Sequence, residues 1–211
     1  MATTKVDIGL IDTTGTASSS TFLRGDGAWA APVGGSLVLL ETDTLGGAAS
    51  EIQSTAFDNS TYNHHRIMIQ ELVPATDGGV TAYMQLEIGD TFITANYAWS
   101  TTRMPAAATG QTSFGYNYDD VDTGIRISSG TTGSGTGESM VGYIDLYNTA
   151  DSGLYKMVSG RMNAHSHNTV ENYPMYVSGL LQQTGQVTGC KVYWGSGNIE
   201  AGGTIKLYGI S

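Results

Sequence analysis

The sequence predicts an all-β protein, an antiparallel jelly-roll-like β-sandwich that follows an extended N-terminal arm and assembles as a trimer. Glycine makes up 29 of the 211 residues, roughly twice its usual share of ~7%. Apolar and polar residues alternate over many short segments, and clusters of Gly, Asn and Asp separate these segments. No segment shows helical periodicity, and the chain is long enough for one β domain with a sizeable core.

The expected strands are recognised by their alternation. Residues 81–90 place Met84 and Leu86 on one face, and residues 140–148 do the same with Leu146. The same pattern recurs at residues 65–73, 92–99, 124–128, 155–167, 173–183, 189–197 and 203–211. We therefore expect about eight to ten strands in the C-terminal part of the chain, a number that is typical of a sandwich or a jelly roll.

Composition divides the chain into an arm of residues 1–34 and a sandwich domain of residues 35–211. The arm contains the low-complexity stretch TTGTASSS, and Pro32 followed by Val-Gly-Gly marks a joint. Within the domain, the Gly- and Ser-rich residues 127–139 are expected to form an exposed loop between strands.

A short apolar cluster interrupts the polar arm. Phe22 and Leu23 precede the turn sequence Arg24-Gly25-Asp26-Gly27, in which glycine gives access to positive φ, and Trp29 follows it. These apolar residues are too few to form a core alone, whereas three copies around a threefold axis could bury them jointly. The alternative is that the cluster packs on its own domain. The expected anchoring and oligomerisation residues are Phe22, Leu23, Arg24, Asp26 and Trp29.

Charge and composition argue against several partners. The chain carries a formal charge of −10, and its nine basic residues form no run or stripe. Nucleic-acid binding through phosphates and adsorption to an anionic membrane are therefore not expected. No apolar run approaches the ~18 residues of a membrane-spanning helix, and the N-terminus lacks a signal-peptide pattern, so we expect no membrane insertion and synthesis in a cytoplasm. Cys190, the single cysteine, is expected to be a buried thiol.

The residues that could carry chemistry are sparse. His165 and His167 share one face of an expected strand, but zinc needs further ligands, so polar strand residues or trimer-interface histidines are the expected role. Residues 119–122 contain three aspartates, yet Val121 interrupts the oxygen pattern of a calcium loop, which favours a solvated acidic turn. No nucleophile elbow, phosphate-binding loop or zinc-protease motif is present. We expect no enzymatic activity, no cofactor and no metal.

Tyrosine is abundant and falls on the polar faces of the expected strands. Its ring offers a large contact area at low entropy cost, together with a hydroxyl. Two interpretations remain open for such residues: contact with a glycan or a protein receptor, and packing between subunits or within the second sheet. The candidate contact residues are Tyr83, Tyr97, Tyr143 and Tyr147.

Two stretches resemble bacteriophage virion proteins. The stretch SSSTFLRGDGAWAAP, residues 18–32, is similar to a short element of phage tail fibres and related appendages that is commonly written near STFLRGDGTW. Residues 36–211 resemble a phage structural domain, and they end in GNIEAGGTIKLYGIS with its final Leu-Tyr-Gly-Ile strand. This chain has Glu-Ile-Gly-Asp at 87–90, where the family often has Phe-Asn-Gly-Asp. The matching positions are Tyr62, His65, Arg66, Gly89, Asp90, Asn96, Tyr97 and Trp99.

The resemblance implies a virion protein with a compact β domain. We expect a homotrimeric tail fibre or appendage that binds other virion proteins, of the tail or the capsid, through residues 1–34 and contacts the host surface with its β domain. A capsid decoration or head-fibre protein that stabilises the head is the first alternative. A carbohydrate-binding module of an enzyme is the second.

Overall fold

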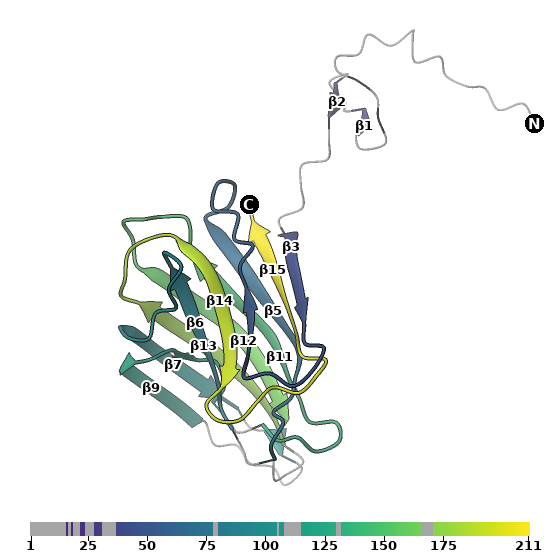
Figure 1. Ribbon diagram of the computed structural model, residues 1–211, viewed down its shortest axis with the longest axis vertical. Helices are drawn as coiled ribbons and strands as arrows, with labels where there is room; N and C mark the ends of the chain where they lie inside the picture. The colour runs from purple at the N-terminus through teal and green to yellow at the C-terminus, as the bar shows by residue number, and fades with distance from the viewer. Residues whose placement is uncertain are drawn as a thin grey trace, which may run out of the picture. The chain divides into compact units, whose positions relative to one another are not determined.

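The computed structural model describes residues 16, 18, 22–23, 28–30, 37–77, 80–104, 106–107, 115–129, 132–165 and 171–211. The chain divides into two compact units, Met1–Leu37 and Val38–Ser211. The regular elements among the described residues are all β-strands, and Figure 1 labels most of them with numbers that follow the chain. The described residues contain no helix that is long and apolar enough to cross a membrane.

The first unit holds a two-stranded ladder at the predicted apolar cluster. β1 (Phe22–Leu23) pairs antiparallel with β2 (Trp29–Ala30), so that Leu23 lies opposite Trp29. Leu23 is exposed and Trp29 is half-buried. Arg24 and Asp26, which the sequence analysis placed in the turn, lie outside the described residues.

The second unit is an all-β sandwich, as predicted. Each of the nine segments predicted from alternation contains a strand, and four further strands, β3, β4, β8 and β9, join them. β9 covers the three aspartates that we expected in a turn; it pairs instead with β7 at the sheet edge, where Asp119 stays exposed. The strands are β3 (Leu37–Thr44), β4 (Glu51–Ser54), β5 (His64–Leu72), β6 (Ala82–Ile88), β7 (Tyr97–Arg103), β8 (Ala106–Ala107), β9 (Gly115–Asp122), β10 (Ile125–Arg126), β11 (Met140–Tyr147), β12 (Lys156–His165), β13 (Glu171–Leu181), β14 (Val187–Trp194) and β15 (Thr204–Ile210).

The strand pairing is jelly-roll-like. β4, β5, β6 and β7 pair antiparallel with β14, β11, β10 and β9, so their partners follow in reverse chain order. A long antiparallel ribbon of strand pairs is thus folded over into two facing sheets, as in a jelly roll. The small sheet has the order β10-β6-β14-β4, and the pairs β5–β11 and β7–β9 belong to the large sheet.

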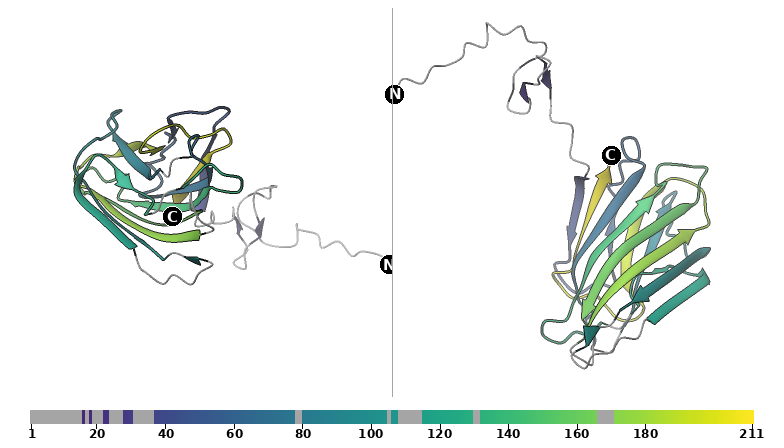
Figure 2. Two further views of the ribbon diagram at one scale, coloured as in Figure 1. Left: turned by 90° about the horizontal axis from the view of Figure 1, so that it is seen from below. Right: turned by 180° about the vertical axis from the view of Figure 1, so that it is seen from behind.

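Additional strands widen the large sheet. Its order is β3-β15-β5-β11-β12-β13-β7-β9, with β8 paired to the end of β13. The strands β12 and β13 stand between β11 and β7, and β15 and β3 extend the sheet beyond β5. The right-hand view of Figure 2 shows these long strands side by side on one face of the domain.

The inner faces of the two sheets form the core. Met84 and Leu86 of β6 and Leu146 of β11 are no more than 1% exposed, as their alternation predicted. Cys190 of β14 is buried, which confirms the expectation for the thiol, and this burial raises its pKa. Apolar side chains from both sheets therefore meet in one continuous cluster.

Tyr97 was expected on a polar face and lies in the core instead. Its side chain is fully buried, and its hydroxyl accepts a hydrogen bond from the Leu86 backbone N–H at 2.8 Å. The residue thereby connects β7 of the large sheet to β6 of the small sheet, and burial raises the pKa of its phenol. The prediction failed because Tyr97 lies on the inward face of β7, which it shares with the buried Trp99 and Thr101.

Residues 127–139 are only partly an exposed loop. Ser128 and Thr132 are fully buried, and the Ser128 hydroxyl accepts a hydrogen bond from the Ala82 backbone N–H at 2.8 Å. Their small side chains let this segment pack closely beside β6. The expectation of exposure is therefore wrong for residues 127–129 and 132–133, which are buried, whereas residues 135–137 are exposed.

Gly160 lies in the middle of β12, between β11 and β13. A Cβ atom at this position would lie 2.5 Å from both the Ile144 Cδ1 atom and the Tyr143 carbonyl oxygen. A side chain there could not be relieved by rotation alone, because one of the two contacts is with backbone. The close approach of β11 and β12 therefore requires glycine.

The variant Gly160→Ala should destabilise the domain by about 1–3 kcal/mol, which is the usual cost of overpacking a core. Thermal unfolding of the full chain should show a melting temperature lowered by several degrees. Gly47→Ala is the matched control, because a Cβ atom there meets nothing within 4 Å. Equal melting temperatures of the two variants would contradict the close packing described for Gly160.

His65 is a buried histidine on the inner face of β5. Its Nδ1 atom lies 2.7 Å from Thr149 Oγ1, and its Nε2 atom has no hydrogen-bond partner among the described residues. The ring packs against Phe57 at a centroid distance of 4.8 Å. Burial lowers the pKa of His65 to about 4, although the negative charge of Asp58 opposes this shift. The ring is therefore neutral at pH 7.

Lowering the pH from 7 to 4.5 should reduce the free energy of unfolding. An unfolded histidine binds a proton near pH 6.5, whereas folded His65 does so only near pH 4, so the unfolded state binds more protons between these values. At pH 4.5 this difference lowers the free energy of unfolding by about 2–3 kcal/mol. Urea unfolding of the wild type and of His65→Gln across this range measures it, and the variant should have the flatter profile. His64→Gln is the control and should keep most of the wild-type slope; identical profiles for all three proteins would refute the assignment.

Candidate functional site

The outer face of the large sheet carries the candidate site. Alternate side chains of β11, β12, β13 and β7 point away from the core, and strand pairing aligns them in rows that run across the strands. The serine row consists of Asp145, Ser159, Ser178 and Ser100. The tyrosine row consists of Tyr143, Arg161, Tyr176 and Thr102.

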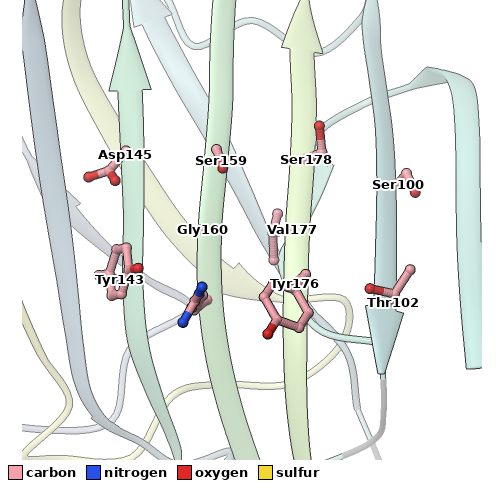
Figure 3. Close-up of a pocket in the computed structure, with 10 residues that line it drawn as sticks. Ser100, Thr102, Tyr143, Asp145, Ser159, Gly160, Tyr176, Val177 and Ser178 are labelled. Atoms are coloured by element: carbon pink, nitrogen blue, oxygen red, sulfur yellow. The ribbon is translucent and has the colours of Figure 1, made fainter. Parts of the chain in front are cut away.

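A depression of about 460 Å³ lies over both rows. Figure 3 shows the serine row and the labelled members of the tyrosine row next to each other on four neighbouring strands. Serine side chains are short, so Ser100, Ser159 and Ser178 form the bottom of the depression, which we call the hydroxyl floor. Tyr143 and Tyr176 stand at its border. Strands lie about 4.8 Å apart, and the floor therefore presents hydroxyl groups at regular intervals of this size.

Asp145, the carboxylate of the serine row, is already hydrogen-bonded to an arginine. Arg66 of β5 donates two hydrogen bonds to Asp145, from Nε to Oδ1 at 2.6 Å and from a terminal nitrogen to Oδ2 at 2.8 Å. The Arg66 guanidinium also lies over the ring of Tyr143, 4.2 Å from its centroid. Its hydrogen bonds with Asp145 raise the pKa of Arg66. A carboxylate held at both oxygens is poorly suited to act as a general acid or base.

Arg161 places an exposed cation in the middle of the tyrosine row. Its guanidinium lies over the ring of Tyr176, 5.2 Å from the centroid. No carboxylate among the described residues lies within 4 Å of Arg161. Its hydrogen-bond donors are therefore available to a ligand in the depression.

A second depression of about 340 Å³ lies on the other side of the tyrosine row. Its lining is mainly apolar and includes Val141, Met162 and Pro174. Gly142 is part of this lining, and β11 and β12 approach closely there, because a Cβ atom would lie 2.3 Å from the Arg161 carbonyl oxygen. The tyrosine row is thus a ridge between a hydroxyl-lined depression and an apolar one.

Exposed apolar and aromatic side chains border the serine row elsewhere. Tyr147, Met157 and Leu180 form the next row across the strands, and Met157 is 56% exposed. At the sheet edge, Tyr116 and Tyr118 of β9 stack nearly parallel with centroids 6.3 Å apart, and they are 71% and 74% exposed. The hydroxyl floor therefore lies between walls that offer apolar contact.

The structure brings two of the four predicted tyrosines to this face. Tyr143 belongs to the tyrosine row, and Tyr147 lies two residues further along β11. Tyr83 lies instead on the outer face of the small sheet, where it stacks with Tyr193 at a centroid distance of 5.8 Å. Tyr97 belongs to the core and contributes no surface contact.

The other predicted polar groups do not assemble into a site. His165 Nδ1 lies 4.0 Å from the carboxylate of Glu138, and His167 lies outside the described residues. Asp122 accepts a hydrogen bond from Trp99 Nε1 at 2.9 Å. Within the described part of the chain, no group of three or more His, Cys, Asp or Glu side chains is placed to hold a metal ion.

Sequence reasoning missed Arg161 and the three serines of the floor. Arg161, Ser159 and Ser178 occupy outward positions in predicted strands, so the alternation indicated which way they point, whereas Ser100 comes directly after the predicted segment 92–99. The alternation did not contain the register between strands, and only the register shows that Ser100, Ser159 and Ser178 are neighbours although they are far apart in the chain.

The arrangement is chemically suited to binding. It offers hydroxyl groups, one available guanidinium and flat aromatic rings, and its carboxylate is neutralised by Arg66. Comparisons of the chain with protein-family models, with curated proteins and with solved structures find no match.

Proposed function

We propose that this chain is a non-enzymatic bacteriophage virion protein. In this proposal it is a trimeric fibre or appendage that is anchored through residues 1–34 and attaches to the host surface with its β domain. The serine row between its aromatic walls is the observation that carries the attachment function. The resemblance of residues 18–32 to a phage appendage element supports the virion role.

A host-surface glycan is the ligand that best suits this face. Sugars combine hydroxyl groups with apolar C–H faces, and the site combines serine hydroxyls with tyrosine rings. The depression is open and shallow, so it can accept a chain that remains attached to a cell. Glycan chains can also extend across several strands, as the rows do.

The N-terminal ladder supports an anchoring role for the arm. Pairing of β1 with β2 places Leu23 opposite Trp29, and Leu23 is 37% exposed. Apolar side chains on such a small ladder gain most by burial in a larger assembly, either among three copies or in a socket of the virion. The same anchor would serve a capsid decoration protein, and antibody labelling of virions in electron microscopy distinguishes a tail site from a head site.

Filling the floor of the site should abolish attachment. In Ser178→Leu, an exposed serine becomes a side chain that occupies the space between Ser159 and Ser100, while the core face of β13 is unchanged. We expect binding to an array of bacterial surface glycans to fall at least tenfold, with a melting temperature within about 2 °C of the wild type. Gln53→Leu, on the exposed face of β4 in the small sheet, is the matched control and should bind normally. Undiminished glycan binding by Ser178→Leu would place attachment elsewhere.

Removal of residues 1–34 should abolish anchoring and leave the β domain folded. The β domain has its own core, so the truncated chain should unfold at nearly the wild-type temperature. We expect light scattering to show a change from trimer to monomer mass, and the truncated protein to be lost from purified virions. A wild-type chain of monomer mass at micromolar concentration, or normal incorporation of the truncated chain, would contradict the proposed anchor.

A further inference from the structure

We propose that the ligand of this face is an anionic glycan whose carboxylate or phosphate group binds Arg161. The inference rests on the proposed attachment function and adds the charge of the ligand and the residue that recognises it. Neither follows from the hydroxyl floor alone, because hydroxyl groups bind neutral and acidic sugars alike.

The charge of these two rows is opposite to that of the chain. Pairing extends the serine row to Arg66 of β5, and it extends the tyrosine row to Lys206 of β15. The two extended rows therefore contain three cations, namely Arg66, Arg161 and Lys206, and one carboxylate, Asp145. Their net charge of +2 (three minus one) contrasts with −10 for the whole chain. An anion approaching this protein is attracted here and repelled by most of the remaining surface.

The pairing of charges leaves Arg161 available. Arg66 and Asp145 neutralise each other through two hydrogen bonds, so Asp145 offers little repulsion to an anion. In the described residues, neither Arg161 nor Lys206 has a carboxylate within 4 Å. A guanidinium binds a carboxylate or a phosphate with two parallel hydrogen bonds, a geometry that a lysine ammonium cannot provide.

The surroundings of Arg161 fit an acidic sugar. The guanidinium is positioned by Tyr176, over whose ring it lies. The hydroxyl floor lies on one side, with Ser159 two residues away on the same face of β12, and the apolar depression lined by Val141 and Pro174 lies on the other. An anionic group on Arg161 therefore places the hydroxyl groups of its own and the next sugar ring over the serines. The apolar depression remains free for a methyl, acetyl or C–H face of the same ligand.

The test uses glycan pairs in which one member carries a free acidic group and the other has that group esterified or removed. One pair is a galacturonic acid hexamer and its fully methyl-esterified form, and the other is a phosphomannan and its dephosphorylated form. The full-length wild type is compared with Arg161→Gln, with Arg161→Lys and with Lys191→Gln. The last variant is the matched control, because it removes one positive charge from the small sheet, where Lys191 pairs with Glu51 at 2.8 Å. Affinity is measured by calorimetry at two salt concentrations, and the mass of each variant by light scattering.

We expect the wild type to bind the acidic member of at least one pair about tenfold or more tightly than the neutral member, with a preference that weakens at high salt. Arg161→Gln should lose this preference and keep the affinity for the neutral member. Arg161→Lys should retain part of the preference, and Lys191→Gln should retain all of it. The pair that shows the effect identifies carboxylate or phosphate as the recognised group.

Three results would overturn the inference in distinguishable ways. Equal affinity of the wild type for acidic and neutral members refutes the anionic ligand and leaves the proposed attachment function intact. Absence of binding to every member of both pairs and to the bacterial glycan array refutes both proposals. A trimer that dissociates in Arg161→Gln shows that this residue holds subunits together, which assigns the face to the assembly instead of a glycan.

Discussion

The antiparallel register from β5 through β11, β12 and β13 to β7 is the constraint on which both faces of the large sheet depend. Apart from a register shift between Met140 and Gly142, where β11 meets the end of β5, the side chains alternate, so Ile144, Val158 and Val177 enter the core because their neighbours point outward. A slip of one residue between any two strands would exchange the two faces. Burial of the inner side chains therefore fixes the positions of the serine and tyrosine rows, and the candidate site needs no packing interaction of its own to hold it.

The unequal width of the two sheets explains where the site lies. A ribbon of four strand pairs would give sheets of similar size, but here β12 and β13 are inserted between β11 and β7. These two inserted strands carry Ser159, Arg161, Tyr176 and Ser178, which form the centre of both rows. The two strands that widen the sheet, β12 and β13, thus also carry the polar and aromatic side chains at the centre of its outer face. Glycine allows β11 and β12 to approach closely at two places, because a Cβ atom at Gly160 or at Gly142 would lie within 2.5 Å of a carbonyl oxygen of the neighbouring strand.

Alternation in the sequence predicted the sandwich and nine of its strands, because those segments have one buried and one solvated face. It did not predict β9, since the spacing of its aspartates was interpreted as a turn, and a strand at a sheet edge can keep such residues in solvent. It placed Tyr97 wrongly, because tyrosine was assigned to a polar face, whereas Tyr97 shares the buried face of β7 with Trp99 and Thr101. The site itself required the register, which a single sequence does not contain: Tyr143 could be proposed from its own strand, but Ser100 and Ser178 become neighbours only through strand pairing.

The rigid strands and the shallow depression together determine how tightly this face would bind a glycan. Rows carried by paired strands are preorganised, so little conformational entropy is lost when a ligand binds. An open depression still buries only part of each sugar, which limits the affinity of a single site. In the proposed trimer, three identical faces are held by one anchor, and a cell surface presents the same glycan many times. The second and third contacts are then intramolecular, and overall binding can exceed the affinity of one site by about 10²–10⁴-fold. The apolar ladder of the arm and the hydroxyl floor of the sheet would thus both contribute to the strength of attachment. The arm would hold three binding faces together, and a shallow site needs this multivalency.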